Sequence, residues 1–245
     1  MILRLILILI AVFLPFMAQA QGLPTITLGI GEANEPAQVS TALQILILLT
    51  ILSVAPSILL MMTAFTRIVI VLSFVRQAMG TQSAPSNQIV VGLALFLTFF
   101  IMAPVFSQIN DEALQPYLNE EITQEEAIPL ALDPMRRFMF SQVGEKDLQL
   151  LIDISGAAQP ETMDDIGMLT LIPAFMLSEL KRAFQMGFLL FVPFLMIDMI
   201  VASILMAMGM MMLPPIIVSL PFKILLFVLV DGWSLVIGSL VQSFA

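Results

Sequence analysis

Four long apolar segments alternate with polar stretches along the chain. They cover residues 43–65, 89–106, 183–213 and 224–244 and contain few charged residues. Each is long enough to cross the apolar layer of a bilayer as a helix, the structure expected where the backbone finds no water. The pattern predicts an all-α integral membrane protein with two helical hairpins, 43–106 and 183–245.

A shorter apolar run opens the chain. Arg4 gives a positive start, an apolar stretch follows, and Ala18-Gln19-Ala20 ends it. This order is typical of a secretory signal peptide, so we expect residues 1–20 to be cleaved after Ala20. The alternative is an uncleaved first membrane helix. Residues 21–42 then form an extracytoplasmic N-terminal segment.

Residues 107–182 separate the two predicted hairpins and carry most of the acidic side chains. The segment Thr123-x-x-Glu126 predicts a capping box, and Asp133-Pro134 predicts a second helix start. Beyond it, an apolar stripe at helical spacing predicts packing of this helix against a neighbour. The stripe comprises Met135, Phe138, Met139 and Val143. We expect a small helical extracytoplasmic region.

The charges of the short connections predict the orientation. Residues 66–88 contain Arg67 and Arg76 and no acid, which is typical of a cytoplasmic loop. Lys223 marks the link before the last segment in the same way. The long acidic region between the hairpins then lies outside.

The composition narrows the function. The chain has 245 residues, 60% of them hydrophobic, with no histidine and no cysteine. This excludes thiol nucleophiles, imidazole bases and most metal sites, and it argues against an enzyme. One tryptophan and one tyrosine make a thin aromatic belt, which favours helices that face protein rather than lipid.

Two acids lie within apolar segments, where a carboxylate is costly and marks a functional candidate. Asp198 and Asp231 are equally far from Pro214-Pro215, so a fold at the prolines would bring them to similar depth. They are candidates for the acid pair of an intramembrane protease, although no Gly-x-Gly-Asp run is present, or for proton carriers in a transporter. The interpretation we favour is pairing with Arg67, Arg76 or Lys223, from this chain or a neighbouring copy.

Methionines gather before the double proline, in "MAMGMMMLPP". Pro214 and Pro215 predict the end of a helix. Methionine is flexible and polarisable and adapts to irregular partners, so a ring of such side chains from several copies would seal a pore and deform around a passing chain. The candidate residues are Met206, Met208, Met210, Met211 and Met212.

Several long stretches resemble one family. "PAFMLSELKRAF" (173–184), "LPPIIVSLPFKILLFVLVDGWSL" (213–235), "TRIVIVLSFVRQAMG" (66–80) and "GLALFLTFFIMAP" (92–104) are similar to the FliP family of flagellar type III export-gate proteins. The resemblance covers nearly all of the chain after residue 20. "SAPSNQ" departs from the family pattern at Ser86, where a second proline is common. The signal peptide and the long acidic region favour the flagellar branch over related virulence-system proteins.

The resemblance implies a gate subunit that carries no nucleic acid, cofactor or metal. Five copies would assemble with FliQ and FliR at the flagellar base in the inner membrane, and unfolded flagellar subunits would pass through the centre. Contacts with FlhB, FlhA and FliO are implied, as is a gasket role for the methionine loop. The family's helices pack in a protein cone raised from the membrane plane.

Two further expectations follow. Glu179, Lys181 and Arg182 fall inside the first family stretch, and we expect them to contact a neighbouring subunit; the alternative is a solvated pair between Glu179 and Arg182, neighbours at i, i+3. The alternative function, from a different class, is a proton-coupled small-solute transporter built from this chain.

Overall fold

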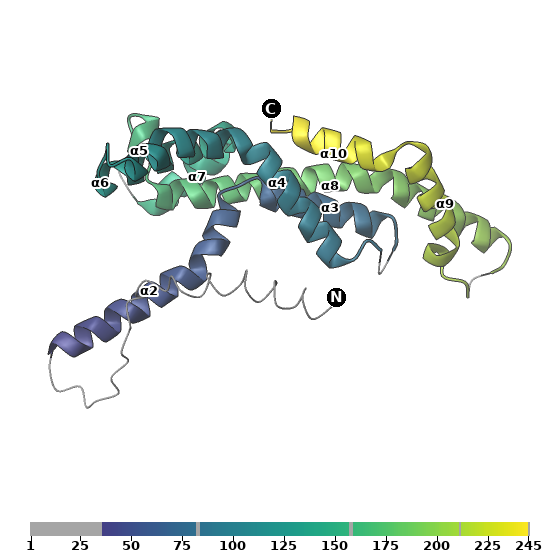
Figure 1. Cartoon of the computed structure of the whole chain (residues 1–245). Helices are drawn as coiled ribbons and strands as arrows, with labels where there is room; N and C mark the ends of the chain where they lie inside the picture. Colours follow the sequence, from purple (N-terminus) through teal and green to yellow (C-terminus); the bar gives the residue numbers. More distant parts are fainter. Residues whose placement is uncertain (1–35, 82–83, 157–158, 211, 245) are drawn as a thin grey trace, which may run out of the picture. The chain divides into compact units, whose positions relative to one another are not determined.

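The computed structural model describes residues 36–81, 84–156, 159–210 and 212–244 (Figure 1), with side chains described from residue 43 onward. Helices make up most of these ranges, and no strand occurs within them. The predicted signal peptide and cleavage site at Ala20 lie outside the described residues. The longer helices are α2 (Pro36–Met61), α3 (Phe65–Ala78), α4 (Asn87–Ile109), α6 (Gln124–Gln142), α7 (Glu145–Ser155), α8 (Met168–Ala207), α9 (Pro215–Leu229) and α10 (Gly232–Gln242).

The chain divides into two compact units, residues 1–51 and 52–245, and α2 runs through the boundary. Pro56 lies inside α2 without ending it. The helix stops at Met61, four residues before the predicted end. Thr63 explains the break, because its hydroxyl donates to the Leu60 carbonyl at 2.9 Å and accepts from the Phe65 N–H at 3.4 Å. These bonds replace helical ones.

The loop predicted at residues 66–88 is wrong over most of its length, because α3 fills it. Ile68, Val71, Leu72 and Val75 repeat at helical spacing and are buried. They form the centre of the larger core cluster, to which α4, α8, α9 and α10 also contribute. Residues 43–106 therefore hold three helices, α2 to α4, rather than a two-helix hairpin. Arg67 is buried, so its charge no longer supports the assignment of residues 66–88 to a cytoplasmic loop.

The second apolar segment extends beyond its predicted end. Ser86 caps α4 by accepting from the Ile89 N–H at 3.4 Å. Pro104 lies inside α4, and the helix continues through a π-helical turn, η2 (Asn110–Leu114), into α5 (Gln115–Leu118). The resulting run is apolar enough and long enough, at 32 residues, to cross a membrane.

Helices α6 and α7 occupy the predicted extracytoplasmic region. The capping box of Thr123 and Glu126 is confirmed, whereas the helix start at Asp133-Pro134 is wrong, because Pro134 lies inside α6. Tertiary packing tolerates the proline there: it is buried with the stripe that follows. Met135 and Met139 are buried in the second core cluster, with Phe138 and Val143 partly buried against it, so the predicted packing of the stripe is confirmed.

Helix α8 begins at Met168, well before the predicted start at 183, and runs for 40 residues. Its first half packs against α6 and α7, and it also packs against α3 and α9 (Figure 1). Residues 168–182 thus belong to the long helix and not to the polar region. In the described ranges, three helices are long and apolar enough to cross a membrane, or four if the bent pair α9–α10 is one span.

The fourth apolar segment begins earlier than predicted and is broken. Helix α9 starts at Pro215, and α9 and α10 meet at 63° across residues 230–231. Asp231 adopts the left-handed region there, with φ +50°. Gly232 permits the close approach, because a Cβ at this position would lie 2.4 Å from the Phe227 ring. Lys223 lies inside α9, so it does not belong to a link between two segments as predicted.

Candidate functional site

Arg67 is the centre of a buried polar cluster that joins four helices. Its Nε donates to Glu179 of α8 at 2.9 Å, and a second donor, on Nη2, reaches the other Glu179 oxygen. Nη1 donates to the carbonyl and to the hydroxyl of Ser243, just after α10, at 2.9 Å each. Nη2 also donates to Gln142, the last residue of α6, at 3.0 Å.

Every donor of the guanidinium is therefore used, since arginine has five N–H groups in a fixed fork. The Phe244 ring covers the guanidinium carbon at 3.8 Å from the ring centroid. Arg67 and Glu179 are both 0% exposed. The cluster thus meets the condition for a stable buried ion pair, namely that further hydrogen bonds satisfy both partners.

This geometry corrects the expectations for Glu179. It neither forms a solvated pair with Arg182 nor faces another copy, because Arg67 of its own chain encloses it. The i, i+3 spacing suggested Arg182, but α3 supplies a better partner from 112 residues away. Arg182 instead donates to the side-chain amide oxygen of Gln142 at 3.0 Å.

Lys181 lies on the outer face of α8. Its ammonium is 3.7 Å from Asp147 at the start of α7, and its side chain is 55% exposed. Asp147 also accepts from the Ser178 hydroxyl at 2.8 Å, and that hydroxyl accepts from the Gly144 N–H at 2.9 Å. These contacts fasten the α6–α7 connection to α8, so Lys181 contributes an exposed ion pair, which adds little to stability.

A second ion pair joins α8 to α9. Lys223 donates to one Asp198 oxygen at 2.6 Å, and the Ser219 hydroxyl donates to the other at 2.5 Å. Lys223 and Ser219 are buried, and the Asp198 side chain is 21% exposed. The arrangement matches the pairing interpretation within one chain. Both carboxylate oxygens of Asp198 are occupied, as a structural role requires.

Asp231 does not lie opposite Asp198 in this way. It is exposed at the α9–α10 break, and the described residues supply it no ion-pair partner. Arg76, in the last turn of α3, is likewise without an ion pair among the described residues. The expectation of two acids meeting across a hairpin is wrong, because the chain does not fold back at the prolines.

The turn lies at Gly209 and not at the double proline. Gly209 has φ +75° and donates to the Met206 carbonyl at 3.0 Å, while Met210 donates to the Leu205 carbonyl at 3.0 Å. This is the Schellman motif, which ends helices at a left-handed glycine. Pro214 and Pro215 begin α9 as N-cap and first residue.

The methionine loop contains partly packed and largely exposed side chains. Met210 is 37% exposed and lines a pocket with Leu205 and Leu213. Met206 and Met208 are 59% and 58% exposed, and Met212 is 96% exposed. Met211 lies outside the described residues. At least three methionines therefore present most of their surface at the tip of the α8–α9 hairpin.

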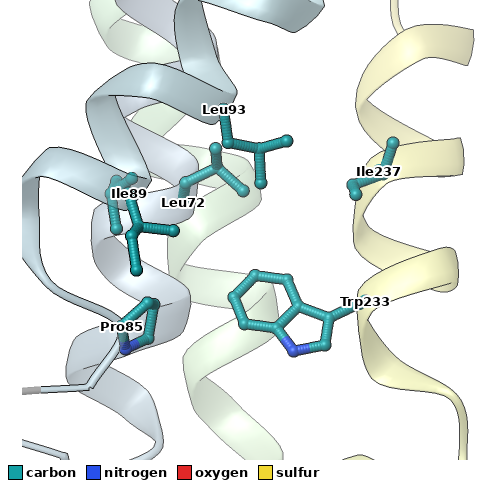
Figure 2. A pocket seen from close by; sticks show the side chains of 7 residues that line it. Leu72, Pro85, Ile89, Leu93, Trp233 and Ile237 are labelled. Carbon is teal, nitrogen blue, oxygen red and sulfur yellow. The ribbon is translucent and has the colours of Figure 1, made fainter. Parts of the chain in front are cut away.

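An apolar pocket of about 230 Å³ lies between α10 and the start of α4 (Figure 2). Trp233 and Ile237 of α10 line one side, and Ile89 and Leu93 of α4 line the other, with Pro85 beside the tryptophan. None of these side chains offers acid–base or metal chemistry. The pocket separates this part of α10 from α4.

Sequence reasoning missed three participants, Gln142, Ser219 and Ser243. Ser219 precedes Lys223 by four positions on one helix, so it shares a face with it, and that spacing was a usable signal. Gln142 and Ser243 carry no local signal, because their role depends on contacts with residues far away in the sequence.

A sequence model of the FliP family matches residues 48–240. The flagellar biosynthetic protein FliP of Bacillus subtilis (strain 168) is 57% identical over 217 residues, which cover 89% of this chain and 98% of that protein. FliP of Pectobacterium carotovorum subsp. carotovorum is 53% identical over 203 residues, 83% of this chain and 79% of that protein. FliP of Aquifex aeolicus (strain VF5) is 49% identical over 224 residues, 91% and 92% of the two chains.

Proposed function

The chain belongs to the FliP family, and on that premise we propose that it is a core subunit of the flagellar type III protein export gate. Unfolded flagellar subunits would cross the bacterial inner membrane through a channel that it helps to form. The observation that carries the proposal is the identity of 57% along almost the whole length of a flagellar biosynthetic protein. The subunit would have no catalytic chemistry of its own.

The apolar surface supports assembly into a larger complex in the membrane. Phe96, Phe99 and Phe100 of α4 are between 62% and 69% exposed on the single chain. A patch of this kind on a soluble monomer would aggregate, so lipid or other subunits must cover it. We assign the gate to the flagellar basal body, with several copies, five by family resemblance, joined to FliQ and FliR.

The remaining architecture follows from the same proposal. Helices α6 and α7 form an extracytoplasmic insertion, and the apolar helices of several copies pack around a common axis. FlhB and FlhA meet the gate from the export apparatus, and FliO assists its assembly.

The methionine loop is the proposed seal of the channel. It lies at the tip of a hairpin whose helices are joined by the Asp198–Lys223 pair, so its side chains are presented on a firm support. Exposed methionines at this tip suit a closure that must yield to cargo of any sequence.

Native mass measurement of the detergent-extracted complex tests the assignment. The protein is produced with and without FliQ and FliR, and the proposal predicts a species that contains several copies of this chain together with both partners. The proton-coupled transporter predicts a species built from this chain alone that binds solute. That second result would remove the gate assignment.

A further inference from the structure

A polar cavity of about 320 Å³ lies beside the Arg67 cluster. Helices α3, α6 and α8 and the end of α10 contribute to it, and two arginines line it. Its lining residues are Arg67, Ser141, Gln142, Arg182, Gln185, Met186 and Ser243.

The two arginines of the cavity differ in what remains of their hydrogen-bonding capacity. Arg67 uses all five of its donors within the chain. Arg182 makes one hydrogen bond, to Gln142, among the described residues. Its other N–H groups and the amide of Gln185, three positions further along α8, remain for a ligand.

The charges around the cavity do not balance. Arg67 and Arg182 bring two positive charges, and Glu179 is the acid that faces them among the described residues. Lys181 and Asp147 pair with each other outside the cavity. One positive charge is therefore left on α8 at Arg182, whose side chain is partly exposed beside the cavity and can be reached from outside.

We infer that this cavity binds a carboxylate, held by Arg182 with Gln185 beside it. A carboxylate matches the forked geometry of a guanidinium and would neutralise the excess charge. The ligand would be a carboxylate on a polypeptide, either elsewhere in this chain or on a neighbouring subunit. Because Arg67 ties α3, α6, α8 and the end of α10 to the same cavity, occupancy would strengthen all four elements together.

Zero-length cross-linking with a carbodiimide tests the inference in the extracted complex. The Arg182→Lys variant keeps the charge and provides an amine. The reagent activates a carboxylate in direct contact, and the amine displaces the urea to form an amide. Mass spectrometry of the peptides then identifies the linked acid, and mixing isotope-labelled with unlabelled copies distinguishes a link within one chain from a link between chains.

The expected result is an amide between position 182 and a carboxylate other than Glu179. Lys181 provides the internal control, since its amine already lies beside Asp147 and should form a link in both the variant and the parent protein. With that control link present, a link from position 182 to Glu179 alone, or no link from it, overturns the inference.

A matched pair of neutral variants gives an independent measurement. Arg182→Gln should lower recovery of the complex by about tenfold, because the bound carboxylate loses its partner. Lys181→Gln removes an equal charge one residue away but outside the cavity, and recovery should stay at the parent level. Equal recovery of the two variants would contradict a ligand at Arg182.

Discussion

The two buried ion pairs among the described residues are built in different ways. Arg67 and Glu179 lie 112 residues apart, are completely enclosed, and gather hydrogen bonds from four helices. Lys223 and Asp198 lie 25 residues apart on consecutive helices, and the acid keeps 21% of its surface exposed. The first pair therefore holds the tertiary arrangement of the bundle, whereas the second holds one hairpin.

The two ion pairs also differ in their distance from the methionine loop, the proposed seal of the channel. The Arg67 cluster lies where α3, α6, α8 and α10 converge, far along α8 from its methionine tip. The Asp198–Lys223 pair lies in the hairpin that carries the methionine loop. Changes at the first site should prevent the subunit from forming, and changes at the second should leave a folded subunit with a loosened tip.

The largest expected effect comes from Arg67→Met. The variant leaves Glu179 buried without its counter-charge, at a cost of about 3–5 kcal/mol, so the folded subunit should fall below detection in membranes. Arg67→Lys retains the charge but not the five-donor fork and should give intermediate levels. Immunoblotting after limited proteolysis measures both. Normal protease resistance of Arg67→Met would show that the cluster is dispensable.

Asp198→Asn should cost less, about 1–3 kcal/mol, because the Ser219 hydrogen bond can survive and the site is partly open to its surroundings. Assembly should decrease, and the export of flagellar subunits should decrease in parallel. Recovery of the complex and export are measured on the same cultures. Complex at the parent level with export abolished would contradict a structural role and favour proton transfer through Asp198.

Gly209→Ala tests the turn that places the methionine loop. Gly209 has φ +75°, and a Cβ added there would meet no heavy atom within 4 Å, so the cost is one of backbone conformation alone, about 1 kcal/mol. Gly92→Ala is the matched control, because its Cβ also meets no neighbour but lies in regular helix, and it should be neutral or slightly stabilising. Thermal unfolding of the extracted complex measures both. Equal unfolding temperatures for the two variants would argue against a left-handed turn.

The smallest expected effect is a loss of stability at the start of α6 when the pH is lowered. The backbone N–H and then the hydroxyl of Thr123 donate to Glu126, and these bonds lower the pKa of its carboxyl. A lowered folded-state pKa means that the carboxylate stabilises the start of α6 fully above its ordinary value of 4.5 and loses this contribution as the pH falls through the folded-state pKa. Amide hydrogens in the first turn of α6 should therefore exchange faster in Glu126→Gln than in the parent protein at neutral pH. In acid the two exchange rates should be the same. Glu125→Gln is the control: it also removes an acid from the first turn of α6 but leaves the Thr123–Glu126 hydrogen bonds in place, so its effect at neutral pH should be the smaller of the two.

Local signals in the sequence predicted the local features of the fold. The capping box, the apolar stripe of α6 and the apolar segments follow from spacing and hydropathy, and all are present. The predicted helix boundaries are wrong where tertiary contacts determine the ends of a helix. The charges of Arg67 and Arg76 predict an exposed loop, yet Arg67 is completely buried at the centre of the helical bundle.

The position of the turn also identifies the partner of Asp198. Gly209 is the eleventh residue after Asp198, and the eleventh residue after Gly209 is Leu220, next to Ser219. From sequence alone, Pro214-Pro215 is a stronger helix-ending signal than Gly209. Proline is also common at the first position of a helix, and here it begins α9. Pairing of Arg67 with Glu179 has no such local signal, because nothing in the sequence specifies which distant helix α3 meets.

The methionine loop at the tip of the hairpin is the proposed seal of the export channel. The variant in which Met210, Met211 and Met212 are all changed to Ala tests it most directly, compared with a control variant that changes three exposed methionines elsewhere, Met163, Met196 and Met199. At equal complex levels, cells with the loop variant should admit a small dye or ions, because shorter side chains widen the ring, while control cells stay tight. Tight membranes in the loop variant would contradict the claim.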